Sequence, residues 1–223
     1  MSPKLHTPIT YLITSGETTA ATTSSTEDFA RLLKLVSAAV AARVNLIQLR
    51  EKELNARVLY ELAWRAAAIT GGSSTGLLVN DRADIARAAG ADGVHLTGSS
   101  LPASVVRQTF GPNFLIGVST HSLAEAQAAH TASADFAVLG PVFETTSKKI
   151  YGAPIGLEQL KEAAQELAPF PIIALGGVTI DNAPECIRAG AAGIAGIGLF
   201  NDPNHLQSAV ATMRCSTGDE GQR

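Results

Sequence analysis

The sequence contains few cysteines, few aromatic residues and no excess of basic charge. Cys186 and Cys215 are the only cysteines, and their spacing fits neither a metal-binding motif nor a disulfide framework. Aromatic residues make up 5% of the chain, and the formal net charge is -3. The sequence therefore lacks both a base-stacking surface and a basic field, and we expect no nucleic-acid partner.

Long hydrophobic runs are missing as well. Residues 1–8 are polar and lack the apolar core of a signal peptide, and no stretch reaches the length needed to span a membrane. Together with the scarcity of cysteine, this predicts a protein of the reducing cytoplasm with no membrane partner. The residues from about 216 onward are polar, and we expect them to form a frayed tail.

Hydrophobic residues are abundant, at 46% of 223 residues, which is enough for a sizeable core. Apolar runs bounded by turn residues predict strands at 9–14, 45–49, 76–79, 93–96, 115–118, 136–139, 171–175 and 193–197. Helical periodicity and capping residues predict helices at 27–42, 55–70, 83–89, 101–110, 123–132, 157–167, 182–189 and 205–215.

Eight strands that alternate with eight helices predict a single-domain (β/α)8 TIM barrel over residues 1–223. Similar helix-to-strand turns recur in every second unit, as expected of a repeated α/β array. An open, doubly wound sheet is the alternative, but no Gly-x-Gly-x-x-Gly turn follows the first strand.

The second predicted strand is apolar and ends abruptly in Arg50, Glu51 and Lys52. In parallel α/β proteins, ligands bind at the carboxyl ends of the strands. Two cations at such an end predict an anionic ligand, although a solvated strand-to-helix turn would have the same composition.

Polar residues follow the other strands too. They are Asn80, Asp81, Arg82, His95, Thr97, Ser99, Ser100, Ser119, His121, Thr145, Thr146, Ser147, Lys148 and Lys149. Asp81 could hold Mg²⁺, which prefers few protein carboxylates together with ligand phosphates, or it could cap the helix at 83–89. His121 could carry a proton, whereas His95 alternates with apolar residues and could be a polar core residue.

Glycines after the last two strands indicate a phosphate site. Gly176 and Gly177 let the backbone approach a ligand, and with Gly198 they occupy the usual phosphate position of these barrels. The hydroxyls and cations of residues 145–149 make a second polyanion site plausible. The loop at 15–26 is either an idle surface loop or a lid. From the residues alone, we predict a barrel enzyme acting on small phosphorylated molecules.

The chain resembles the thiamine-phosphate synthase/TenI family from residue 9 to about 200, and seven short runs carry the resemblance. They are residues 48–52, 79–82, 93–96, 117–121, 140–143, 147–149 and 174–178. The resemblance implies a (β/α)8 barrel, in agreement with the strand count. It also implies that the chain joins hydroxymethylpyrimidine diphosphate to thiazole phosphate, giving thiamine phosphate and diphosphate with Mg²⁺ as the cofactor.

The resemblance assigns roles to individual residues. Catalytic roles are implied for Arg50, Lys52, Asp81, Ser119, His121 and Lys148. Substrate binding is implied for Gln48, Arg50, Lys52, Asn80, Ser119, Thr145, Ser147, Lys148, Gly177, Ile197 and Gly198. Asp81 would be the metal ligand. Partners would be phosphorylated small molecules, and a homo-oligomer is left open.

One position departs from the synthase pattern. Ser100 stands where synthases carry an acidic second Mg²⁺ ligand, and a hydroxyl is a poorer ligand than a carboxylate. The TenI branch of thiazole tautomerases lacks that acid too, uses no metal, and would act through His121. A non-catalytic regulator that binds thiamine-pathway phosphates is a third hypothesis. Because Lys52, Asn80 and Asp81 match the synthases, the synthase is the favoured prediction.

Overall fold

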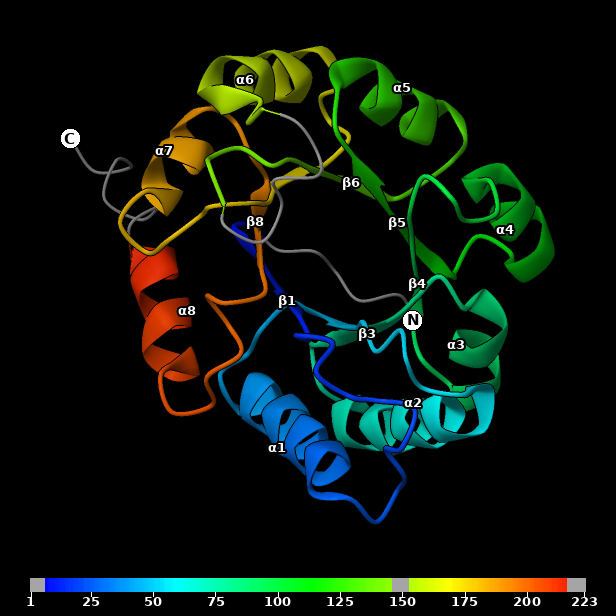
Figure 1. The fold of residues 1–223 in the computed structure, drawn as a ribbon. Helices are drawn as coiled ribbons and strands as arrows, with labels where there is room; N and C mark the ends of the chain where they lie inside the picture. Colours follow the sequence, from blue (N-terminus) through cyan, green and yellow to red (C-terminus); the bar gives the residue numbers. More distant parts are fainter. Residues whose placement is uncertain (1–6, 146–152, 216–223) are drawn as a thin grey trace.

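The computed structural model describes residues 7–145 and 153–215, which form a closed barrel of parallel strands surrounded by helices (Figure 1). The strands are β1 (Ile9–Ile13), β2 (Leu46–Leu49), β3 (Gly76–Asn80), β4 (Gly93–Leu96), β5 (Leu115–Thr120), β6 (Phe136–Leu139), β7 (Ile172–Ala174) and β8 (Gly193–Gly196). The helices are α1 (Glu27–Ala41), α2 (Ala56–Thr70), α3 (Ala83–Ala89), α4 (Ala103–Phe110), α5 (Leu123–Thr131), α6 (Gly156–Glu166), α7 (Ala183–Arg188) and α8 (Leu206–Cys215). The predicted (β/α)8 barrel is confirmed.

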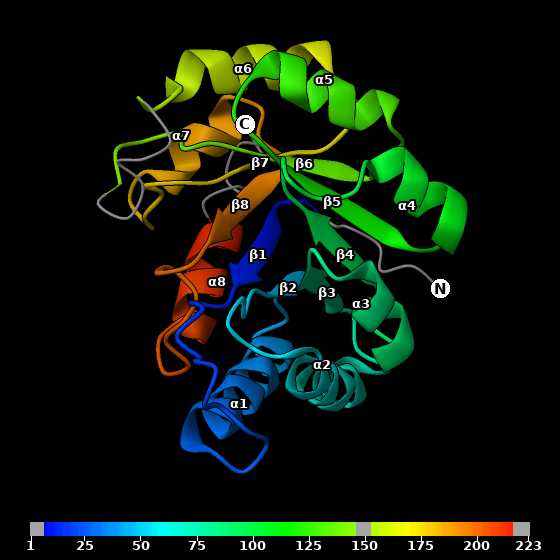
Figure 2. The ribbon, with the colours of Figure 1, turned by 45° about the vertical axis from the view of Figure 1, so that its right-hand side comes forward.

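Each strand pairs with its neighbour in sequence, and β8 returns to pair with β1. The turned view in Figure 2 shows β1 and β8 side by side, with α8 packed outside them. All carboxyl ends of the strands therefore meet at one mouth, so residues that lie far apart in the sequence converge there.

The core consists of two hydrophobic clusters, one inside the barrel and one between the strands and the helices, because successive side chains of a strand point to opposite faces. On β1, Ile9, Tyr11 and Ile13 face the barrel interior, whereas Leu12 faces the helices. The interior cluster consists of Ile9, Tyr11, Ile13, Leu46, Leu78, Leu115, Phe136, Val138, Ile173 and Ala195. The barrel interior is therefore a packed core, and side chains of the opposite parity fill the layer under the helices.

Element boundaries follow local chemistry. Asn55 and Ser122 cap α2 and α5, because their side chains accept hydrogen bonds from the backbone amides of Val58 and Glu125. The prediction ended β5 two residues too early, at Val118. The strand continues to Thr120 because the ladder to β6 continues through two more residue pairs. Helix α4 starts at Ala103 and not at 101, with a proline in the N-cap position.

Candidate functional site

The carboxylate of Glu51, just after β2, is surrounded by hydrogen-bond donors from the β1–α1 loop. Its Oε1 accepts the Thr14 hydroxyl at 2.5 Å and the Gly16 amide at 3.3 Å. Its Oε2 accepts the Thr18 hydroxyl at 2.6 Å and the Thr18 amide at 3.3 Å. Only 3% of the surface of Glu51 is exposed. Through these hydrogen bonds, Glu51 anchors the β1–α1 loop to the end of β2.

Arg50 is part of the same junction. Its amide donates to the Thr14 hydroxyl oxygen at 2.8 Å. Gly16 has a φ of +75°, and a Cβ at that position would lie 3.1 Å from the Arg50 carbonyl oxygen and 3.3 Å from Nη1. A glycine is thus needed for the loop to pass this close to Arg50. Neither Arg50 nor Lys52 forms an ion pair with any residue in 7–145 or 153–215.

A pocket of about 290 Å³ opens where β2, β3 and β4 end. Its lining includes Lys52, Asn80 and Asp81, three of the residues implied to bind substrate or metal. Glu51 and Arg82 line it too, whereas Arg50 does not. Hydroxyl-bearing residues that follow β4, Thr97 and Ser99, line the same pocket. It offers a cation, an amide, a carboxylate and hydroxyls to one ligand, which suits a phosphate accompanied by a divalent cation.

Asp81 is exposed and adopts an unusual backbone conformation. Its φ is +62°, in the left-handed region that is rare for residues other than glycine, although aspartate tolerates it better than most. Its amide donates to the His95 carbonyl at 2.9 Å, which extends the ladder between β3 and β4. The alternative that Asp81 caps α3 is wrong, because Arg82 occupies the N-cap and no side chain caps that helix.

Arg82 is paired with Asp84 on the rim of this pocket. Nε and Nη2 of Arg82 donate to the two carboxylate oxygens of Asp84 at 2.9 and 2.7 Å. This contact is the main cause that lowers the pKa of Asp84. Arg82 therefore forms its ion pair with Asp84, and its interaction with the nearby Asp81 is a weaker electrostatic one.

The oxygen donors at this pocket fit Mg²⁺ only in combination with a phosphate. Within the described ranges, no group of three or more His, Cys, Asp or Glu side chains could hold a metal. Glu51 also lines the pocket, but its oxygens are hydrogen-bonded to the β1–α1 loop, so Asp81 would be the only carboxylate ligand. Mg²⁺ commonly takes one or two carboxylates and completes its shell with phosphates and water. The Ser100 hydroxyl accepts the Thr97 amide at 2.7 Å within a local turn, so Ser99, and not Ser100, lines the pocket.

A chain of hydrogen bonds crosses the barrel interior just below the mouth. Nε2 of Gln48 donates to the Tyr11 hydroxyl at 2.9 Å, and that hydroxyl lies 3.1 Å from Nδ1 of His95. Nε2 of His95 lies 2.8 Å from the hydroxyl of Ser119. A side chain at Gly117 would collide with the Phe136 ring at 2.3 Å, so this glycine makes room for the aromatic cluster around His95.

The direction of each hydrogen bond between Gln48 and Ser119 follows from which groups carry a proton. Burial raises the pKa of Tyr11, so its hydroxyl keeps its proton. While it accepts from Gln48, the Tyr11 hydroxyl can donate its own proton to Nδ1 of His95. The proton of a neutral His95 then lies on Nε2 and is donated to Ser119. The Ser119 proton is left to point at a ligand in the mouth.

His121 lies directly after β5 and is held by two contacts. Its Nδ1 donates to the Gly140 carbonyl at 2.6 Å, and its backbone amide donates to Glu125 at 2.8 Å. A neutral imidazole held through Nδ1–H carries its basic lone pair on Nε2. The geometry therefore suits His121 to accept or deliver a proton.

The predicted phosphate turns follow β7 and β8. Gly176 and Gly177 have φ values of +95° and +66°, and a Cβ on Gly177 would lie 2.5 Å from the Glu144 carbonyl oxygen. The β6–α6 loop therefore packs directly against this turn. Thr145 lies in that loop and is partly buried. The candidates Thr146, Ser147, Lys148 and Lys149 lie outside the described residues.

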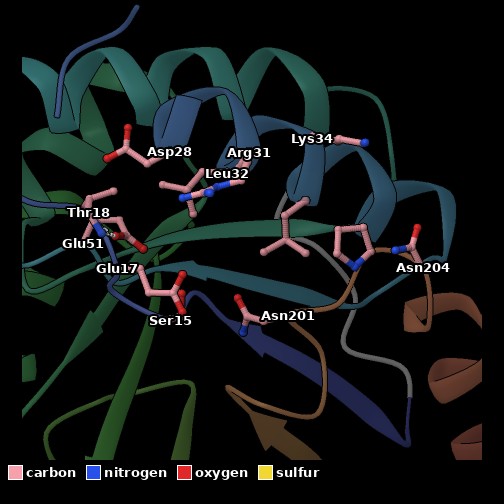
Figure 3. Close-up of a pocket in the computed structure, with 12 residues that line it drawn as sticks. Ser15, Glu17, Thr18, Asp28, Arg31, Leu32, Lys34, Glu51, Asn201 and Asn204 are labelled. Carbon is pink, nitrogen blue, oxygen red and sulfur yellow. Dashed lines mark hydrogen bonds between the residues drawn. The ribbon is translucent and has the colours of Figure 1, made fainter. Parts of the chain in front are cut away.

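Asn201 fixes the turn after β8. Its Nδ2 donates to the carbonyl of Ile197 at 2.5 Å and to the carbonyl of Ile13 at 2.6 Å. The turn that contains Ile197 and Gly198 is thereby joined to the end of β1. Asn201 also lines a second pocket, of about 280 Å³, between α1 and the loops after β1 and β8 (Figure 3).

Sequence reasoning missed three functional contributions. Tyr11 was predicted only as part of a strand, although its parity with Ile9 and Ile13 places it inside the barrel. The contact of Asn201 with Ile13 and the buried role of Glu51 carry no local signal, because the partners lie 188 and 33 to 37 residues away. His95 is 2% exposed, which agrees with the polar-core interpretation, yet it orients Ser119.

The helices in residues 7–145 and 153–215 are too short or too polar to span a lipid bilayer.

Comparison with known proteins gives a consistent result. The model of the family described as thiamine monophosphate synthase (TMP-TENI) matches residues 19–200. The chain is 44% identical to a Moorella thermoacetica protein named thiamine-phosphate synthase, over 82% of this chain and 86% of that protein. It is 38% identical to the thiamine-phosphate synthase of Chlorobium luteolum, over 97% and 98% of the two chains.

A solved structure agrees as well. The thiamine phosphate pyrophosphorylase of Pyrococcus furiosus superimposes with a TM-score of 0.75 at 30% identity, covering 93% of this chain and 94% of that one.

Proposed function

Because this chain belongs to the thiamine monophosphate synthase family, we propose that it is a thiamine-phosphate synthase. It is a transferase that joins hydroxymethylpyrimidine diphosphate to thiazole phosphate and releases diphosphate. The observation that carries the proposal is the convergence of Lys52, Asn80 and Asp81 on one pocket. That pocket lies at the strand ends where the diphosphate would leave.

The reaction requires charge stabilisation more than a nucleophile. The bond between the pyrimidine methylene carbon and the diphosphate oxygen breaks, and both electrons leave with the diphosphate. The thiazole nitrogen then supplies the electron pair of the new carbon–nitrogen bond. Arg50 and Lys52 have no ion-pair partner in the described ranges, so their charge is available for the departing diphosphate.

Asp81 would hold Mg²⁺ against the diphosphate, with Asn80 and the hydroxyls of Thr97 and Ser99 around it. A divalent cation there would neutralise part of the charge on the leaving group. The exposed Asp81 carboxylate, held out by a left-handed backbone, suits this role because no residue in 7–145 or 153–215 neutralises it with an ion pair.

Ser119 would orient the pyrimidine part of the substrate. Its hydroxyl accepts from His95, so its own proton is directed at a ligand acceptor such as a ring nitrogen. Thiazole phosphate would bind at the opposite side of the mouth, against the amides of Gly177 and Gly198. In that arrangement the two substrates approach each other across the mouth.

The hydrogen bond from His121 to Gly140 supports a second candidate, thiazole tautomerase. That reaction moves a proton within a thiazole carboxylate phosphate, and Nε2 of His121 would accept and return it. It would need neither Asp81 nor a metal.

The test is a turnover assay of the purified protein with both substrates, with and without Mg²⁺. We expect thiamine phosphate only with the metal. His121→Gln, which cannot act as a base, should retain synthase turnover within about tenfold, because proton transfer by His121 is not part of bond formation. Metal-free proton transfer that is lost in His121→Gln, without thiamine phosphate formation, would establish the tautomerase. Binding of both phosphates without either turnover would instead indicate a regulator.

A further inference from the structure

Glu51 is the only carboxylate in the buried class among the residues that the structure describes. A buried ionised group is costly unless hydrogen bonds compensate for its lost hydration. Here two hydroxyls and two backbone amides supply that compensation, and all four belong to the segment Thr14–Thr18. Figure 3 shows Glu51 beside Thr18 in the lining of the pocket along α1.

Two contacts connect this segment to Arg50. The Thr14 hydroxyl donates to Glu51 and accepts the Arg50 amide, so one oxygen joins the buried carboxylate to the Arg50 backbone. Gly16, whose amide donates to Glu51, lies against both the carbonyl oxygen and the guanidinium of Arg50. A displacement of the loop would therefore displace Arg50.

We propose that Glu51 is a positioning residue, which holds the segment Thr14–Thr18 in place and through it aims Arg50 at the diphosphate. This inference rests on the proposed function, because it takes the diphosphate as the ligand of Arg50. Glu51 lines the edge of the same pocket, but both of its oxygens are taken by hydrogen bonds from the loop, so its role is to hold the loop and not to bind the diphosphate.

The geometry requires a carboxylate at this position. A glutamine has one oxygen, so its amide nitrogen must face either the Gly16 amide or the Thr18 amide. Hydroxyls can rotate to accept a hydrogen bond, but backbone amides cannot. One backbone donor would then oppose another donor, and the loop would move away from Arg50.

The experiment is a double-mutant cycle on Arg50→Ala and Glu51→Gln, read by calorimetric binding of inorganic diphosphate in the presence of Mg²⁺. On the wild-type background, Glu51→Gln should raise the dissociation constant about tenfold, because Arg50 is misplaced. On the Arg50→Ala background, the same change should have less than about a twofold effect. Glu17→Gln, which removes an exposed carboxylate from the same loop, is the matched control and should leave the constant within about twofold.

Hydrogen exchange provides a second readout. Glu51→Gln should speed exchange of the Arg50 amide, which depends on Thr14, and leave the helix α5 amides unchanged. If Glu51→Gln does not fold, Thr18→Val replaces it in the cycle, because it removes one donor to the carboxylate and keeps the side-chain shape.

The outcomes separate this inference from the proposed function. A wild-type protein that fails to bind diphosphate overturns the diphosphate site, and the inference with it. Normal diphosphate binding combined with equal losses from Glu51→Gln on both backgrounds leaves the synthase intact and overturns the positioning role. Unchanged diphosphate binding in Glu51→Gln overturns it as well.

Discussion

Two carboxylates, Glu51 and Asp81, line one pocket at the mouth of this barrel, and they differ in burial and in hydrogen bonding. Glu51 is 3% exposed and takes four hydrogen bonds from the β1–α1 loop. Asp81 is exposed, and its backbone lies in the left-handed region. The first carboxylate holds the β1–α1 loop, whereas the second is exposed at the pocket, where the proposed function would use it to bind Mg²⁺. Residue type and strand-end position alone would not distinguish them.

This difference predicts that substitutions of Glu51 should mainly change stability, whereas substitutions of Asp81 should mainly change activity. Groups that are kept unpaired or strained in a folded protein concentrate at functional sites, because their cost is tolerated only where they are used. A carboxylate that is saturated with hydrogen bonds should matter for unfolding. An open carboxylate should matter for catalysis.

The largest effect should come from Asp81→Asn, which keeps the shape and removes the charge. We expect the rate of thiamine phosphate formation to fall on the order of a thousandfold, because a neutral amide is a poor Mg²⁺ ligand. The free energy of unfolding should stay within about 0.5 kcal/mol of the wild type. Steady-state kinetics and urea unfolding measure the two quantities, and normal turnover in this variant would remove Asp81 from the metal site.

Glu51→Gln, unlike Asp81→Asn, should lower the free energy of unfolding. It leaves a backbone donor unpaired in a buried site, so the free energy of unfolding should fall by about 2 kcal/mol. Glu53→Gln, an exposed neighbour, serves as the control and should change it by less than about 0.5 kcal/mol. A loss no larger than that of the control would mean that the four hydrogen bonds at Glu51 contribute nothing net.

Asp81→Gly should raise stability while abolishing activity. Asp81→Gly relieves the left-handed backbone conformation, for which a side chain carries a cost of about 1 kcal/mol, less for aspartate than for most residues. We expect a gain in unfolding free energy of about 0.5 kcal/mol together with loss of synthase turnover. A destabilised Asp81→Gly variant would show that the aspartate side chain supports the fold after all.

The smallest effect should come from Asp84→Asn, on the rim of the same pocket. Arg82 lowers the pKa of Asp84 in the folded protein, so the pair stabilises the fold above the ordinary pKa of 3.8. That contribution is lost as the pH falls through the lowered pKa. The pair is mostly exposed, so we expect about 0.3 kcal/mol at pH 7 and none at pH 2, measured by urea unfolding. A difference that persists at pH 2 would contradict the electrostatic cause.

Much of the fold could be predicted from the sequence because strand and helix patterns are local. Every predicted strand and helix is present, and Lys52, Asn80 and Asp81 meet because neighbouring strands end at the same mouth. The end of β5 was missed because Ser119 and Thr120 look like a turn, whereas pairing with β6 keeps them in the strand.

Long-range side-chain partners could not be predicted in the same way. Glu51 stands between two cations in the sequence, which suggests a local charge pair, yet its partners are hydroxyls and amides of a loop more than 30 residues earlier. Likewise, the interior chain from Gln48 to Ser119 depends on which side of each strand faces inward. Sequence periodicity gives that parity only when the barrel register is known.

The hydrogen bond from Asn201 to Ile13 joins residues that are 188 positions apart. Such a contact cannot form until nearly the whole chain has been synthesised, and closing so long a loop is entropically costly and slow. The seam between β8 and β1 should therefore be among the last parts of the barrel to form. Because Asn201 joins the turn after β8 to the end of β1, a partly folded chain would form its β2–β3 pocket before the turn that contains Ile197 and Gly198. If that turn binds thiazole phosphate as the proposed function requires, affinity for this substrate would report whether folding is complete.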